Sequence, residues 1–288
     1  MNSTNRREDI KRDFQQALLT WAKSKLRDYP WRRTKNSAYK ILVAELLLKR
    51  TTATAAARAY NPFIRKFPTV NHLFHATKDE LAGTLEPIGL SKQRAHAIKE
   101  LAQVLIQRYE GQVPTTLEKL YDLPGIGDYA ARAIMSFSHD TPLAVVDGNV
   151  ERVLRRVFQD QLVKIPNRAT IQNIVDDLLP ENGHRNFNFA LLDLGSLICR
   201  PTRPSCYKCP LQRWCDYARI PQDTRLSGRL RGLRQARQLS LLELAKKAGV
   251  TKLTIINMEA GRTYPRKETL RKIARVLDLS IEDIAERL

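Results

Sequence analysis

Four cysteines lie within seventeen residues of this 288-residue chain, and it contains no others. They follow the spacing Cys199-x6-Cys206-x2-Cys209-x5-Cys215. Disulfides that stabilise a fold usually join distant segments, whereas four thiolates in one short loop can wrap an iron–sulfur cubane or a zinc ion. Zinc ribbons more often carry two close C-x2-C pairs, and only one is present here. The spacing therefore predicts a [4Fe–4S] cluster in a loop at 199–215, with zinc as the alternative.

The charge of the chain is strongly unbalanced. Lys and Arg number 49 against 30 Asp and Glu, which gives a net charge of +19 and a pI near 10. This imbalance favours a polyanion partner, although a merely solvated basic surface is the alternative. A site with four cysteine ligands has no open position for catalysis. We therefore expect the cluster to hold a basic loop against phosphates, through the interleaved residues Arg200, Arg203, Lys208 and Arg213.

Periodicity along the chain predicts an all-α fold. An amphipathic helix is expected over 9–27 and a second helix over 39–57, and alternating apolar and polar runs are scarce. The segment 218–228 lacks periodicity and contains proline and glycine, so we expect a linker between a domain at 1–217 and a second, basic domain at 229–288. The polar N-terminus and the absence of a long apolar run predict a cytoplasmic chain without a secretory signal or membrane span.

An LPGIG turn at 123–127 separates two helical patterns. The spacing Thr115-x-x-Glu118 predicts a capping box for the first helix, and the second is expected to begin at Asp128. Gly125 and Gly127 allow a tight turn whose backbone N–H groups face outward at a helix N-terminus, and such a site favours phosphate. A plain helix–helix turn is the alternative.

Two carboxylates are candidates for chemistry. Glu45 interrupts the apolar run 41–48, where a carboxylate costs free energy unless it is paired or functional. Burial would raise its pKa, which suits a general acid, and a surface position is the alternative. Asp147 follows a second apolar stretch and precedes a helix expected over 150–158. It can be a simple helix N-cap, but we expect Asn149 to fill that role and Asp147 to face a pocket.

Together these residues resemble the helix-hairpin-helix base-excision DNA glycosylases. The LPGIG turn, Asp147 eighteen residues beyond Tyr129, and the cysteine spacing carry the likeness, which covers about 12–218. Within that superfamily the chain is similar to endonuclease III and MutY, and most similar to the Mig-type thymine/uracil mismatch glycosylases. The resemblance implies two helical subdomains with the active site in the cleft between them. It also implies duplex DNA as the partner, with the mismatched or deaminated nucleotide flipped out of the stack.

The resemblance assigns roles to three residues. Asp147 aligns with the catalytic carboxylate that stabilises the oxocarbenium-like sugar or orients the attacking water. Glu45 aligns with the acid that assists departure of the base in MutY. At position 129, endonuclease III-like enzymes carry a lysine that attacks C1′, MutY-like enzymes a small hydroxyl residue, and Mig-like enzymes a tyrosine. Because a phenol cannot form a Schiff base, Tyr129 implies a monofunctional glycosylase, with a buried structural tyrosine as the alternative.

Two further positions bear on the substrate. Lys49 and Arg50 stand where MutY-like enzymes show a Gln-Gln-Thr pattern, and Arg50 can enter the gap left by the flipped base or contact the widowed guanine. With Tyr129, they favour thymine or uracil opposite guanine. The sequence at 146–150 is closer to MutY, so adenine excision is the second candidate, although the chain lacks MutY's second domain. A sequence-specific regulator on an inactive scaffold is the third.

The basic tail resembles the Cro/C1 or XRE-type helix-turn-helix. Ser240 and Thr251 are expected to cap its second and third helices, and Gly249 to form the turn between them. The first residues of the third helix, Thr251, Lys252 and Leu253, would then face base edges in the major groove. The resemblance implies recruitment of the glycosylase to particular DNA sequences, or a transcriptional regulator. Dimerisation or partner docking is the alternative.

Overall fold

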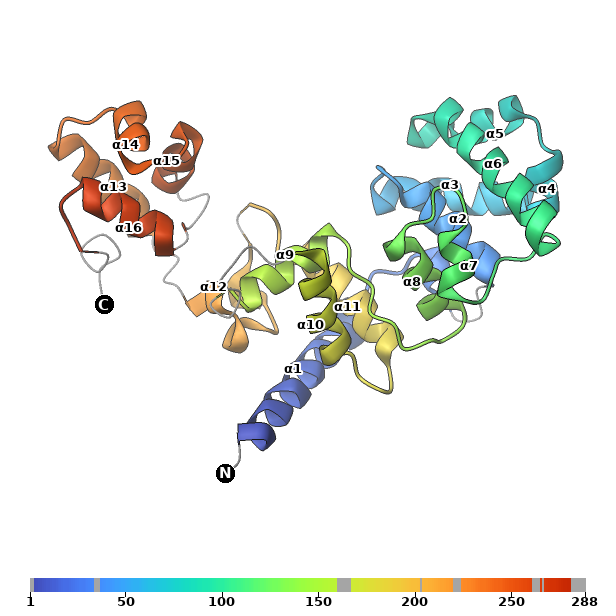
Figure 1. Cartoon of the computed structure of the whole chain (residues 1–288), viewed down its shortest axis with the longest axis horizontal. Helices are drawn as coiled ribbons and strands as arrows, with labels where there is room; N and C mark the ends of the chain where they lie inside the picture. Colours follow the sequence, from blue (N-terminus) through green and yellow to red (C-terminus); the bar gives the residue numbers. More distant parts are fainter. Residues whose placement is uncertain are drawn as a thin grey trace. The chain divides into compact units, whose positions relative to one another are not determined.

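The computed structural model describes residues 3–33, 37–159, 167–202, 204–219, 224–260, 265 and 267–280. Every regular element in these ranges is helical, which confirms the all-α fold (Figure 1). None of the described helices is long and apolar enough to cross a bilayer. The chain divides into two compact units, one formed by Met1–Glu151 with Ile165–Asp193 and the other by Arg152–Lys164 with Leu194–Leu288. The domain limits at 217 and 229 stay predictions.

The first unit contains most of the helices. They are α1 Ser3–Lys25, α2 Ala38–Leu48, α3 Ala53–Lys66, α4 Val70–His75, α5 Lys78–Leu85, α6 Ser91–Tyr109, α7 Leu117–Tyr121, α8 Asp128–Ser138 and α10 Arg168–Leu178, with short 3₁₀ helices η1 Pro30–Arg32 and η2 Glu86–Ile88. Helices α9 Gly148–Val157 and α11 His184–Leu197 begin in this unit and continue into the second.

Helix α2 lies in the middle of the first unit's core. All seven residues from Ile41 to Leu47 are buried, and the helix packs against α3 and α8. Burial of so many aliphatic side chains is the main source of stability for a helix of this composition. Ser37 caps its N-terminus by accepting a hydrogen bond from the N–H of Lys40. A polar side chain between Ile41 and Leu47 is therefore forced into an apolar environment.

The single helix expected over 39–57 is wrong, because two helices occupy this range. Helix α2 ends at Leu48 and α3 begins at Ala53. The hydroxyl of Thr52 accepts a hydrogen bond from the N–H of Ala55 at 3.3 Å, which caps the new helix. Between the helices, Arg50 adopts a left-handed conformation with φ 51°. The short loop that results projects Lys49 and Arg50 from the end of α2.

The glycine turn joins α7 to α8, and α8 begins at Asp128 as predicted. Gly125 has φ 76°, a conformation that glycine adopts without strain. The predicted capping box at Thr115 is wrong. Thr116 is the N-cap, and its side chain accepts a hydrogen bond from the N–H of Lys119 at 3.5 Å. The helix therefore starts one residue later than expected, and Glu118 is too early in it to close a box.

The second unit ends in four helices, α13 Thr224–Ala236, α14 Leu241–Ala248, α15 Lys252–Glu259 and α16 Lys267–Val276 (Figure 1). As predicted, Ser240 caps α14, Gly249 ends it with φ 63°, and Thr251 caps α15. A separate apolar core, which includes Leu244, Ile255 and Ile273, joins these helices. The remaining elements are α12 Asp216–Arg219, η3 Cys206–Lys208 and η4 Gln212–Trp214. Helical residues thus extend into both ends of the expected linker 218–228, and 220–223 lie outside the described residues.

Candidate active site

Glu45 is a carboxylic acid held inside the apolar core. It lies on α2 and is only 6% exposed. Burial is the main cause that raises its pKa to about 8, the charge of Asp147 raises it further, and Lys49 opposes the shift. Burial penalises the charged form, so this side chain is mostly protonated at neutral pH. The predicted buried acid is confirmed, and the alternative of a surface position is wrong.

Asp147 is the N-cap of α9. Its Oδ1 accepts hydrogen bonds from the N–H groups of Asn149 and Val150, both at 2.8 Å, and its Oδ2 accepts one from the Asn149 side-chain amide at 2.8 Å. The expectation that Asn149 would be the cap is wrong, because the helix begins at Gly148 and so puts Asp147 at the cap position. The carboxylate is half-buried. Three of its roughly four lone-pair positions are used by these bonds.

Tyr129 lies on α8, half-buried against the core of the first unit. Burial and the charges of Glu45 and Asp147 raise the pKa of its phenol well above the ordinary value, and only Arg32 opposes them. The interaction between two charges weakens as the distance between them grows, so charges that shift a pKa strongly lie nearby. The three predicted catalytic residues therefore lie within electrostatic reach of one another, and the phenol keeps its proton at neutral pH.

The predicted DNA-contacting residues of the first unit meet at the end of α2. The Lys49 ammonium donates a hydrogen bond to the carbonyl of Gly125 in the glycine turn. A Cβ atom at Gly125 would lie 3.1 Å from the Lys49 Nζ, so the two segments are in close contact. Arg50 and Gly127 are both exposed. The structure thus joins the α2 loop to the hairpin turn, which are 76 positions apart in the chain.

An ion cluster near these residues was not predicted from the sequence. Asp193 is completely buried on α11 and accepts hydrogen bonds from Arg27 at 2.7 Å and Arg32 at 2.6 Å. The same Arg32 opposes the pKa shift of Tyr129. A buried charge needs such partners because its desolvation is costly. The sequence does carry a signal for Asp193, which is a lone aspartate within an apolar helix. The same kind of signal identified Glu45 as buried.

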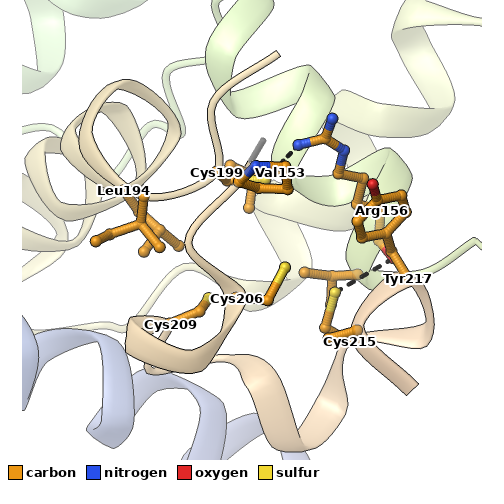
Figure 2. Close-up of a pocket in the computed structure, with 12 residues that line it drawn as sticks. Val153, Arg156, Leu194, Cys199, Cys206, Cys209, Cys215 and Tyr217 are labelled. Atoms are coloured by element: carbon orange, nitrogen blue, oxygen red, sulfur yellow. Dashed lines mark hydrogen bonds between the residues drawn. The ribbon is translucent and has the colours of Figure 1, made fainter. Parts of the chain in front are cut away.

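The four cysteines form no disulfide, and together they line one pocket in the second unit. Figure 2 shows their side chains around it. The rest of the lining is largely apolar and includes Val153 of α9, Leu194 of α11 and Ala218 of α12. Within the described ranges, no three His, Cys, Asp or Glu side chains are arranged to hold a single metal ion. The predicted gathering of the four thiols is therefore observed, and a preformed one-ion site is not.

Arg156 on α9 was not singled out by sequence and contacts both ends of the cysteine loop. Its guanidinium donates to Cys199 Sγ at 3.3 Å and to the carbonyls of Arg200 at 2.7 Å and Pro201 at 2.9 Å. It also lies 4.7 Å from the ring centroid of Tyr217 (Figure 2). Cys215 Sγ donates to the backbone carbonyl of Arg156 at 3.5 Å. This arginine therefore stabilises the loop conformation at the pocket.

The predicted basic residues of the cysteine loop are exposed where the structure describes them. Arg200, Lys208 and Arg213 are exposed, and Arg203 lies outside the described residues. In the last four helices, Thr251, Lys252 and Leu253 are exposed at the start of α15. Leu253 is 61% exposed, which is unusual for a large aliphatic side chain.

Comparison with known proteins identifies relatives over most of the chain. Residues 43–175 match the family model "HhH-GPD superfamily base excision DNA repair protein", and 230–284 match a helix-turn-helix family. The chain is 36% identical over 217 residues to the thymine/uracil-DNA glycosylase of Methanothermobacter thermautotrophicus, covering 75% of this chain and 96% of that one. It is 33% identical over 199 residues to the adenine DNA glycosylase of Mycolicibacterium smegmatis, covering 68% of each.

Two solved structures also resemble this chain over most of its length. A thermostable thymine-DNA glycosylase matches with a TM-score of 0.70 and 35% identity, over 76% of this chain and 99% of that one. Endonuclease III in a non-covalent DNA complex matches with a TM-score of 0.64 at 21% identity, over 76% and 98% of the two chains. The second likeness extends the shared fold to a more distant protein.

Proposed function

The chain belongs to the HhH-GPD superfamily of base excision DNA repair proteins and is a DNA glycosylase, and we propose that it excises thymine or uracil from G·T and G·U mismatches in double-stranded DNA. The observation that carries this proposal is the position of Tyr129, whose phenol lies within electrostatic reach of Glu45 and Asp147. A phenol at this position supports hydrolysis without strand cleavage. The relatives named thymine and thymine/uracil glycosylases support the choice of base.

In the proposed reaction, the flipped nucleotide presents its C1′ to the carboxylate of Asp147. As the bond from C1′ to N1 breaks, its electron pair leaves with the pyrimidine and positive charge develops on the sugar. The Asp147 carboxylate stabilises that charge, and its three hydrogen bonds hold it in one orientation. Water adds at C1′ and loses a proton, so the products are an abasic site and the free base.

Glu45 supplies a proton or hydrogen bond to the departing base. Its pKa of about 8 keeps it protonated at neutral pH, as a general acid requires. Lys49 and Arg50 are assigned to the DNA around the lesion, with the donors of Arg50 directed to the widowed guanine. The backbone of the turn at Gly125 and Gly127 is assigned to a phosphate.

For the cysteine pocket we propose a [4Fe–4S] cluster held by Cys199, Cys206, Cys209 and Cys215. The donor set fits, since four thiols line one largely apolar pocket. Each cysteine of a cubane binds a different iron atom, so the thiols need not converge on a single ion as they do for zinc. When bound, the cluster contributes structure: it fixes the loop that exposes Arg200, Lys208 and Arg213 to phosphates.

Adenine excision is the second candidate. It is favoured by the protonated Glu45, because a purine leaves more easily when an acid protonates it, and by the relatives named adenine DNA glycosylases. The helix-turn-helix part is proposed to bring the enzyme to particular sequences, with Thr251 and Lys252 at the DNA. A purely regulatory protein is disfavoured because Asp147 and Glu45 are both present.

The test is a panel of duplexes containing G·T, G·U or G·A, incubated with full-length protein and with Asp147→Asn. Excision of thymine and uracil should give strand breaks after alkali and few before it, and Asp147→Asn should lose them by about a hundredfold or more. Breaks only at G·A would select the adenine enzyme. No breaks on any duplex, with tight binding of one sequence, would select the regulator.

A further inference from the structure

Arg94 is a buried arginine with an unusually complete set of hydrogen bonds. It lies on α6 and is 8% exposed. Its Nε donates to the carbonyl of Gly89 at 2.9 Å, and its Nη1 to the carbonyls of Leu46 at 2.9 Å and Leu47 at 3.5 Å. Its Nη2 donates to the carbonyl of Lys49 and the hydroxyl of Thr51. A guanidinium has five N–H donors, and here five acceptors surround it.

These acceptors belong to two segments that contain strained residues. The first is the end of α2 with the loop after it, where Arg50 has φ 51°, and the second is the turn before α6, where Leu90 has φ 55°. A left-handed conformation costs about 1–2 kcal/mol for a residue that is not glycine, so it persists only when the surroundings hold it. Both side chains are exposed. Arg94 therefore bonds to the two segments that contain these strained residues, whose side chains are exposed.

Helix α2 also depends on this arginine. The last carbonyls of a helix lack partners within it, and a glycine commonly follows to satisfy them through a local turn. No glycine follows α2, and Arg94 supplies the missing donors from another helix. Burial and the nearby charge of Arg50 both lower the pKa of Arg94, which places the two guanidinium groups close together. The two positive charges repel each other, and the hydrogen bonds of Arg94 hold its guanidinium in place despite this repulsion.

We propose that Arg94 is a positioning residue for mismatch recognition, which holds the loop of Lys49, Arg50 and Thr51 and the turn at Gly89 in the conformation that meets DNA. It acts through Arg50 and does not itself touch the nucleic acid. The inference rests on the proposed DNA contact of Arg50. Lysine cannot replace Arg94, because a single ammonium cannot reach both segments at once.

The test is a double-mutant cycle on the full-length protein, with Arg94→Lys, Arg50→Ala and the combination. Binding is measured to a duplex with a tetrahydrofuran abasic analogue opposite guanine and to the same duplex fully paired. We expect Arg94→Lys to lower the binding preference for the abasic duplex about tenfold. Adding Arg50→Ala to Arg94→Lys should then lower this preference little further. Additive losses, or an unchanged preference, would overturn the proposal.

Two controls keep the result interpretable. Arg108→Lys changes an exposed arginine on the same helix and should leave the preference unchanged. If Arg94→Lys does not fold, as judged by circular dichroism, Thr51→Val removes only one of the five acceptors and takes its place in the cycle. Because binding is measured without excision, a protein inactive on G·T would still give a readable cycle, so the two proposals fail separately.

Discussion

The charge of Asp147 raises the pKa of the Glu45 carboxyl, although the first residue caps α9 and the second is buried within α2. Asp147 accepts three hydrogen bonds at a helix N-terminus, whereas Glu45 lies in an apolar core. Two carboxyl groups in such different surroundings can take different roles, one as a negative charge and the other as a proton donor.

Glu45→Gln is expected to stabilise the protein at alkaline pH and to have little effect at acid pH. An unfolded chain releases this proton near the ordinary pKa of 4.5, whereas the folded protein keeps it until about pH 8. The unfolded state therefore binds fewer protons in this window, and the wild-type free energy of unfolding falls as pH rises through it. Glutamine has no proton to lose, so its advantage in Tm should widen from about pH 5 to 8 and then level off. A difference independent of pH would contradict the assignment.

The sequence was sufficient for features that depend on neighbours in the chain. Glu45 could be identified as buried because apolar residues flank it on both sides. Ser240 and Thr251 could be identified as N-caps because capping is a local interaction. The N-cap of α9 was assigned two residues too late, because Asp147 and Asn149 are both good caps and only packing decides between them. Arg94 could not be found, since its partners on α2 are more than 40 residues away and any exposed helix can carry an arginine.

Substitutions at Asp147 should distinguish its structural role as the N-cap of α9 from its proposed catalytic role. Asp147→Ser keeps a side chain that can cap α9 but removes the charge, so we expect stability within a few tenths of a kcal/mol of wild type and almost no excision. Asp147→Ala removes both and should cost about 1 kcal/mol as well as activity. Denaturant melts and a G·T excision assay check the pair. If Asp147→Ser retained activity, the carboxylate would serve only as a cap.

Arg156→Gln should weaken the proposed cluster. The substitution removes a donor to Cys199 Sγ and the bonds to two loop carbonyls. Hydrogen bonds to cluster sulfurs raise the reduction potential, so the variant should hold less iron per chain, and the cluster that remains should have a lower potential. Iron analysis, visible absorption and voltammetry measure this. Lys208→Gln, which loses the same charge from an exposed position in the loop, should match wild type. If both variants had the same iron content and reduction potential, Arg156 would have no role in holding the cluster, and only its packing against Tyr217 would remain.

Lys252→Ala should reveal whether the start of α15 reads bases or only holds phosphates. Lys252 is exposed in the first turn of the helix, beside the exposed Leu253. A lysine on a phosphate releases about one counterion on binding, so its loss should lower affinity for all duplexes alike and reduce the salt slope by about one. A lysine on a guanine should instead lower affinity mainly for the preferred sequence, which selection from a random duplex library can supply. Salt titrations of full-length protein on both kinds of duplex distinguish these cases, with Lys246→Ala on α14 as the charge-matched control. No change for either duplex would exclude this face from DNA and leave dimerisation or partner docking as its role.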